Sequence, residues 1–283
     1  MKHEGLSTFT LTIGIAIIAV VIGVSVYFLS LGGEEELPAG GPYYSQIYSA
    51  TSSDGIHWTV DNTLLFDHAD VPGAVYFNGK LYLYYVNADF EGERLRVGIS
   101  EDRGATFTTY DVQISGSNSP NPVDPTALVD GNQIRLTYLG NLGQGETNKI
   151  VTATSTDGIH FTEEGVIFTG DAYDPDLFYD ESSGQWVLLT GVSGVLTKAT
   201  ASSLDTQFTT DPSFTWTLGE ITSTHRIGNK YYTYYMEKGR ISVAEYENGE
   251  LSKIADGIVD GGNPTVAIFG ENDYKMFFTR STA

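Results

Sequence analysis

The chain has 283 residues, of which 15 are Lys or Arg and 36 are Asp or Glu, so its formal net charge is −21. This acidic balance argues against a nucleic-acid partner, because nucleic-acid binding needs clustered basic side chains. The sequence has no cysteine, which excludes disulfides, thiolate metal sites and cysteine nucleophiles, and its hydrophobic share of 41% suffices for the core of a large domain.

A long uncharged segment, Phe9 to Leu31, lies near the start of the sequence. About 20 apolar residues cross a bilayer as a helix, and this segment is longer than the apolar part of a typical signal peptide. Lys2 precedes it and three Glu residues follow at 34–36, which favours an outside location for the rest of the chain. We therefore predict a cytoplasmic stub (1–8), a single transmembrane helix (9–31) and a flexible linker (32–41), with the remainder on the extracytoplasmic side of the cell membrane.

Two hairpin patterns alternate through residues 42–283. In the first pattern a strand ends in a Ser-x-Asp turn with a nearby Gly, and an aromatic residue begins the next strand. Asp and Gly favour such turns because they tolerate positive φ. Three copies of this pattern lie at 48–58, 97–107 and 150–161, and two weaker copies lie at 196–208 and 241–251.

The second pattern is a strand, a short polar turn and an aromatic-rich strand. Copies of it lie at 72–85, 125–138, 175–189, 224–235 and 264–278. Two hairpins per repeat give four strands in roughly 50 residues, which is typical of propeller blades. The two ends of this region carry complementary half-repeats, beginning near Tyr44 and Pro264, so we predict a fifth blade built from both of them. The predicted fold is an all-β, five-bladed propeller with four-stranded blades, and an open β-sandwich is the alternative.

The Ser-x-Asp turns resemble the Asp-boxes of sialidase-type propellers, and Ser100–Phe107 fits that pattern in full. Such boxes mark a fold rather than an activity. With five blades, residues 42–283 resemble the five-bladed glycosidases of the arabinanase/β-xylosidase type (glycoside hydrolase family 43) and their invertase-like relatives. The resemblance implies a first-blade carboxylate as general base, a third-blade Asp that adjusts the pKa and orients the sugar, and a fourth-blade Glu as general acid.

The third-blade motif, Tyr-Asp-Pro-Asp at 173–176, matches the family best and makes Asp174 the candidate pKa modulator. Glu220 lies six residues before Arg226, the spacing of the family's general acid, although Ile-Thr follows it where the family has Gly-Pro. Asp70 is the candidate general base. It is one residue out of phase, because Val71 separates it from the proline that directly follows the family's Asp.

Four more polar residues near these positions are candidates for substrate contacts. They are Asp124, Asp176, His225 and Asn263. Asn263 stands where the family often has a His that helps to hold a metal or water, so we predict no metal site, and nothing in the sequence indicates a cofactor. A purely structural role is the alternative for Asp124 and its counterparts, because Asp or Asn before Pro can simply cap a turn.

Glycoside cleavage needs a protonated carboxylic acid and a second, ionised carboxylate. The innermost strands of a propeller converge on one axis, so acids at their starts can share a cavity and raise one another's pKa. The sequence thus predicts a membrane-tethered glycoside hydrolase with a carbohydrate substrate. The displaced Asp70 and the missing Gly-Pro favour the alternative, a non-catalytic propeller that binds a glycan or a protein.

Overall fold

The computed structural model describes residues 38, 41–117, 122–140, 147–192 and 195–282. The chain divides into two units, Met1–Pro38 and Ala39–Ala283, and nearly all of the described residues belong to the second. The predicted stub, membrane helix and most of the linker lie outside the described residues. Within the described part of the chain, no helix is long and apolar enough to cross a bilayer.

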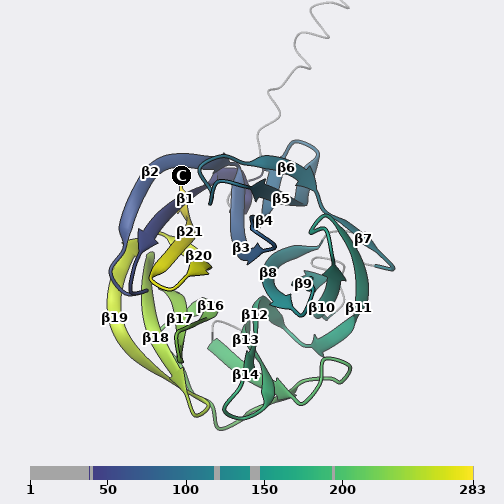
Figure 1. Cartoon of the computed structure of the whole chain (residues 1–283). Helices are drawn as coiled ribbons and strands as arrows, with labels where there is room; N and C mark the ends of the chain where they lie inside the picture. Colours follow the sequence, from purple (N-terminus) through teal and green to yellow (C-terminus); the bar gives the residue numbers. More distant parts are fainter. Residues whose placement is uncertain (1–37, 39–40, 118–121, 141–146, 193–194, 283) are drawn as a thin grey trace, which may run out of the picture. The chain divides into compact units, whose positions relative to one another are not determined.

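The second unit is a propeller of five β-sheets arranged around one axis (Figure 1). Blade one contains β3 (Ala69–Phe77), β4 (Lys80–Asp89), β5 (Gly92–Ser100) and β6 (Thr108–Asp111). Blade two contains β8 (Val123–Asp130), β9 (Gln133–Gly140), β10 (Lys149–Ser155) and β11 (His160–Thr169), and the short β7 (Gln113–Ser115) adds to β11 in parallel. Blade three contains β12 (Ala172–Asp180), β13 (Gln185–Val192), β14 (Val195–Ala201) and β15 (Thr209–Thr210). Blade four contains β16 (Glu220–Ile227), β17 (Lys230–Glu237), β18 (Arg240–Glu247) and β19 (Glu250–Asp260).

Blade five is built from both ends of the propeller, as predicted. It contains β20 (Gly262–Gly270), β21 (Asp273–Ser281), β1 (Ser45–Ser52) and β2 (Thr59–Asp67), preceded by a 3₁₀ turn, η1 (Gly41–Tyr44). In Figure 1 the yellow strands β20 and β21 lie beside the purple β1 and β2. β1 pairs with β21 along its whole length, from Ser45 opposite Ser281 to Ser52 opposite Tyr274. The prediction of five blades and of this closure is confirmed, and the sandwich alternative is wrong.

The Ser-x-Asp turns hold the two outer strands of a blade together by their own side chains. In blade one the Asp102 carboxylate accepts a hydrogen bond from the backbone N–H of Thr106 at 2.8 Å and one from the Ser100 hydroxyl at 2.7 Å. The same hydroxyl accepts from the N–H of Gly104 at 2.7 Å. Because the side chains satisfy these turn N–H groups, the motif specifies the hairpin wherever it occurs.

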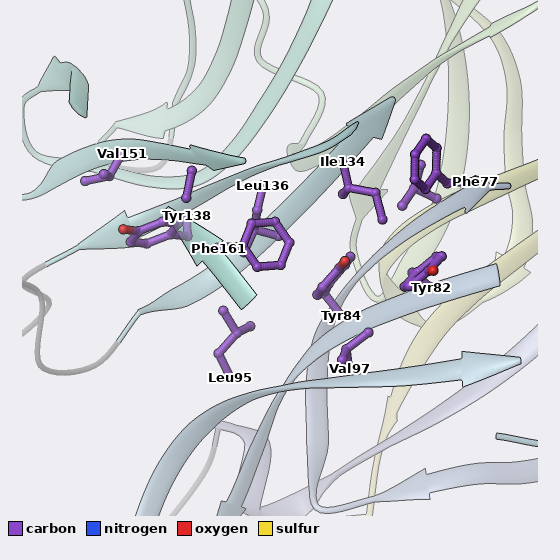
Figure 2. Packing of buried hydrophobic residues seen from close by; sticks show 12 residues of the cluster. Phe77, Tyr82, Tyr84, Leu95, Val97, Ile134, Leu136, Tyr138, Val151 and Phe161 are labelled. Atoms are coloured by element: carbon purple, nitrogen blue, oxygen red, sulfur yellow. The ribbon is translucent and has the colours of Figure 1, made fainter. Parts of the chain in front are cut away.

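The core is divided among the interfaces between neighbouring blades. Figure 2 shows the interface of blades one and two, where Tyr84 and Phe161 meet edge to face with ring centroids 5.8 Å apart. The Tyr84 hydroxyl donates to the carbonyl of Gly158 at 3.0 Å. Gly158 has a φ of +77° and closely approaches Tyr82, so a side chain there would collide with the ring. The aromatic residues of the repeats thus join one blade to the next.

The inner strands of blades three, four and five are joined by hydrogen bonds near the axis. The buried Asp176 carboxylate on β12 accepts from the backbone N–H of Thr224 on β16 at 3.1 Å and from its hydroxyl at 2.7 Å. His225 on β16 accepts, through Nε2, from the N–H of Val266 on β20 at 3.1 Å. These bonds join β12 to β16 and β16 to β20.

Blade one is joined to both of its neighbours in the same region. The N–H of Ala74 on β3 donates to the Thr265 hydroxyl on β20 at 3.0 Å. On the other side Gly73 lies against β8, where a Cβ on Gly73 would stand 2.4 Å from the carbonyl oxygen of Pro125. Glycine is therefore required there, because any side chain would push blades one and two apart.

Candidate functional site

Each inner strand starts with an irregular step in its pairing, and one residue at that step has a positive φ. We call these five the bulge residues: Val71 (φ 48°), Asp124 (52°), Asp174 (49°), Ile221 (56°) and Asn263 (47°). All of them except Ile221 directly precede a proline. The repeated Asp-Pro pattern seen in the sequence therefore marks a repeated backbone feature.

The bulge residues line a narrow pocket of about 20 Å³ on the propeller axis. We call this end of the axis, where the inner strands start, the axial mouth. The structure thus brings together Asp124, Asp174 and Asn263, three of the residues predicted from the sequence. Val71 occupies the blade-one position in this pocket. The one-residue displacement of Asp70 in the sequence is therefore also a displacement in space.

Asp70 lies beside the axial mouth, is only 8% exposed and is held by blade five. Its carboxylate accepts from the Ser45 hydroxyl at 2.7 Å, from the N–H of Val71 at 2.8 Å, and from the side-chain amide of Asn263. Three donors on one carboxylate hold it in a fixed orientation.

Glu220, at the first position of β16, faces a second space between blades three and four. It lines a cleft of about 240 Å³ together with Trp216 and Met236. Trp216 is 7% exposed, and its indole Nε1 has no hydrogen-bond partner within the described part of the chain. Glu220 also approaches Gly191, where a Cβ would stand 3.1 Å from Oε2, so the absence of a side chain at 191 makes room for the carboxyl group.

Blades one and four differ from the other three at the bulge in a specific way. Asp and Asn adopt the left-handed region most readily, whereas a β-branched residue there is an outlier that costs about 1–3 kcal/mol. Val71 and Ile221 are such outliers. Each directly follows a candidate catalytic carboxyl group, Asp70 in one case and Glu220 in the other. Among the five bulge residues, the two β-branched outliers are therefore those that directly follow a candidate catalytic carboxyl group.

Burial and the charges of neighbouring carboxyl groups raise the pKa of two acids at the mouth. Burial, followed by the charges of Asp124, Glu220 and Asp70, raises the pKa of Asp174 well above its ordinary value. Burial also raises the pKa of Asp124 to about 6; a backbone hydrogen bond from Asp174 opposes this rise, while the charges of Asp70 and Glu93 add to it. We call Asp70, Glu93, Asp124, Asp174 and Glu220 the carboxyl cluster. Within this cluster, Asp124 and Asp174 are the members at the mouth that retain their protons to higher pH than a free Asp does.

Glu93 was missed by sequence reasoning. Burial and the charge of Asp70 raise its pKa. It lies on β5, outside the first strand of any blade, where no repeat or motif marks it, so only the fold shows its proximity to Asp70. No group of His, Asp or Glu within the described ranges has the arrangement of a metal site.

Two of the residues predicted to contact substrate lie away from the axial mouth. Asp176 is buried and bonds Thr224 between blades three and four. His225 lines a larger cavity toward the other ends of the inner strands. Substrate contact by either residue remains a prediction.

No protein-family model matches the chain, and no curated protein matches its sequence. Solved glycoside hydrolases do share its fold. A family 117 glycoside hydrolase from the marine bacterium Zobellia galactanivorans has a TM-score of 0.58 at 14% identity, over 85% of this chain and 92% of its own. A thermostable family-43 glycoside hydrolase has a TM-score of 0.55 at 15% identity, over 74% of this chain and 88% of its own. The GH43_1 enzyme from Xanthomonas citri has a TM-score of 0.55 at 13% identity, over 76% of this chain and 88% of its own. The predicted resemblance to the five-bladed glycoside hydrolases is confirmed at the level of the fold.

Proposed function

We propose that the protein is a glycoside hydrolase whose chemistry takes place at the axial mouth. The observation that carries this proposal is the pairing of a carboxyl group with a strained β-branched residue in blades one and four, Asp70 with Val71 and Glu220 with Ile221. Strain of this kind is retained where function needs a side chain in one orientation. The glycoside hydrolase fold of the solved neighbours supports the same reading.

In the proposed reaction Glu220 is the general acid and delivers its proton to the departing glycosidic oxygen. Glu220 is suited to this role because it lines the cleft that also contacts Trp216. This cleft can hold the departing part of the substrate. Asp70 is the general base that takes a proton from the attacking water, and its three hydrogen-bond donors keep its carboxylate oriented. The raised pKa of Asp174 favours its protonated form, which can donate a hydrogen bond to a sugar hydroxyl or to Glu220.

The second candidate is a glycan-binding propeller without catalysis. Two observations favour it: Val71 occupies the blade-one position of the axial pocket, and that pocket has a volume of only about 20 Å³. A sugar would then bind across the mouth without reaching an acid and a base together.

A hydrolysis screen distinguishes the two candidates. The full chain is incubated with arabinan, xylan, galactan, mannan and their oligosaccharides, and new reducing ends are measured. We expect product from at least one glycan, and equal product from the matched Glu271→Gln variant, which alters an exposed carboxylate in the turn before β21. Glycan binding by the wild type without product would establish the binding-module candidate in place of the enzyme.

We also propose that residues 9–31 anchor the protein in the cell membrane with the propeller outside, on the basis of the uncharged segment and its flanking charges. The full chain should remain in the membrane pellet after a carbonate wash, and external protease should release the propeller by cutting near Gly40 and Gly41. A matched chain lacking residues 1–31 is the control and should be soluble. Release of the intact full chain by carbonate would contradict the anchor.

A further inference from the structure

A space much larger than the axial pocket lies beyond the bulge residues, toward the other ends of the inner strands. This far cavity has a volume of about 400 Å³, within the range of small-ligand sites. All five inner strands line it, through residues 74–76, 126–129, 177–179, 224–226 and 266–268.

Aromatic rings form part of its wall. Tyr179, on β12, is 43% exposed and packs edge to face on Trp186, with ring centroids 5.3 Å apart. The Tyr231 hydroxyl donates to the backbone carbonyl of Tyr179 at 3.0 Å, which fixes blade four against this side. The far cavity therefore has exposed aromatic surface held in place before any ligand binds.

The backbone of the inner strands supplies both hydrogen-bond donors and hydrogen-bond acceptors to the cavity. β3, β16 and β20 each stand at the edge of their own sheet, so one side of each strand has no pairing strand. The N–H groups of Ala74, Thr224 and Val266 point to this unpaired side, because each bonds a side chain of another blade. Alternate residues of a strand point the same way. The N–H and C=O groups of the residues two positions further on therefore also face the unpaired side, and all three line the cavity: Tyr76, Arg226 and Ile268.

His225 adds a side-chain donor. Its Nε2 accepts from the N–H of Val266, so the ring proton sits on Nδ1. Burial lowers the pKa of His225 to about 4, so the ring is neutral at neutral pH. Nδ1 has no hydrogen-bond partner within the described residues. Arg226 and Glu181, which also line the cavity, pair with each other, so their charges largely cancel.

We propose that the far cavity is a second saccharide-binding site, separate from the axial mouth, that takes a neutral mono- or disaccharide unit. A sugar presents C–H faces that pack on aromatic rings, and hydroxyls that both donate and accept hydrogen bonds. The aromatic rings match the C–H faces of a sugar, and the backbone N–H and C=O groups match its hydroxyls. A purely apolar ligand would leave the backbone groups unpaired, and an anion would find no uncompensated positive charge in this lining, because Arg226 is already paired with Glu181.

The three tryptophans of the chain report on binding separately, because Trp186 lines the far cavity, Trp216 lines the cleft beside Glu220, and Trp58 lines neither. The full chain, labelled with ¹⁵N at its indoles, is titrated with arabinose, xylose, galactose, glucose, mannose and their disaccharides. We expect the Trp186 indole resonance to shift in a saturable manner with at least one of them. No shift of Trp186 with any of these sugars, or a shift of Trp216 alone, would overturn the proposal.

Two tyrosines at opposite ends of β12 make a matched pair of variants. Tyr179 lines the far cavity, whereas Tyr173 is 40% exposed and directly precedes the bulge residue Asp174. Tyr179→Ala should weaken the saturable Trp186 shift about tenfold, as expected when about 1.4 kcal/mol of ring contact is lost. Tyr173→Ala should leave it unchanged. Unchanged affinity in Tyr179→Ala, or an equal loss in both variants, would overturn the assignment. Because this readout is independent of hydrolysis, it stands apart from the catalytic function proposed for the mouth.

Discussion

Replacing Glu220 by Gln should slow hydrolysis of a natural glycan by about 10²–10⁴-fold, the usual contribution of a general acid. The amide keeps the shape of the side chain but has no acidic proton for the departing oxygen. An aryl glycoside with a good leaving group needs little protonation, so its rate should fall far less. Initial rates of the variant on the two substrate types measure this difference.

Asp70→Asn provides the contrast within the same site. The attacking water must lose a proton whichever group departs, so this variant should be slow on both substrates. Glu271→Gln, at an exposed turn, should be normal on both. Equal losses on the two substrates in Glu220→Gln would remove Glu220 as the acid, and normal rates in Asp70→Asn would assign the base to another member of the carboxyl cluster.

Replacing Asp124 by Asn should make the protein more stable above about pH 7. The pKa of Asp124 is raised from 3.8 to about 6 in the folded state, chiefly by burial. The ionised carboxylate therefore costs folding free energy, at most about 3 kcal/mol for a difference of this size. The neutral amide removes that cost and can still accept the hydrogen bond from the Asp174 backbone. For a domain of this size, each kcal/mol should raise Tm by about 2–4 °C.

The pH dependence of this gain follows from the sign of the shift. Below pH 3.8 the carboxyl group is protonated in both the folded and the unfolded chain, so its contribution to stability is fully present. It is lost as the pH rises through 3.8 to about 6, because the unfolded chain releases its proton first. The stability difference between Asp124→Asn and wild type, from urea unfolding, should thus grow over this window and then level off. A difference that is constant with pH, or one shared by Glu271→Gln, would contradict the burial of Asp124 in its charged form.

The fold could be predicted from the sequence because its repeating elements are encoded locally. The turn at Ser100–Phe107 satisfies its own backbone N–H groups with its own side chains, so a few residues specify a hairpin. The aromatic residue after such a turn, Phe161 in blade two, then packs on the neighbouring blade. Closure followed from complementary half-repeats near the two ends. Each of these signals lies within one short segment.

The details of the candidate site could not be read in this way. Val71 and Ile221 belong to a residue class that avoids positive φ, so no sequence rule places them in the same backbone conformation as Asp174. Their positions are imposed by the ring, in which all five inner strands start with the same step. Likewise His225 is only five residues after Glu220, but the extended strand between them carries it to a different cavity.

The composition of blade five determines the order in which the ring can assemble during synthesis. β1 and β2 emerge from the ribosome first, but β21, which pairs with the other edge of β1, follows every other strand of the propeller. Until then β1 and β2 form only a two-stranded hairpin, which is marginally stable in water. Pairings between strands distant in sequence form slowly, and an open strand edge invites association with other chains. We therefore expect ring closure to be the last and slowest folding step, and nascent chains to depend on chaperones until β21 has been made.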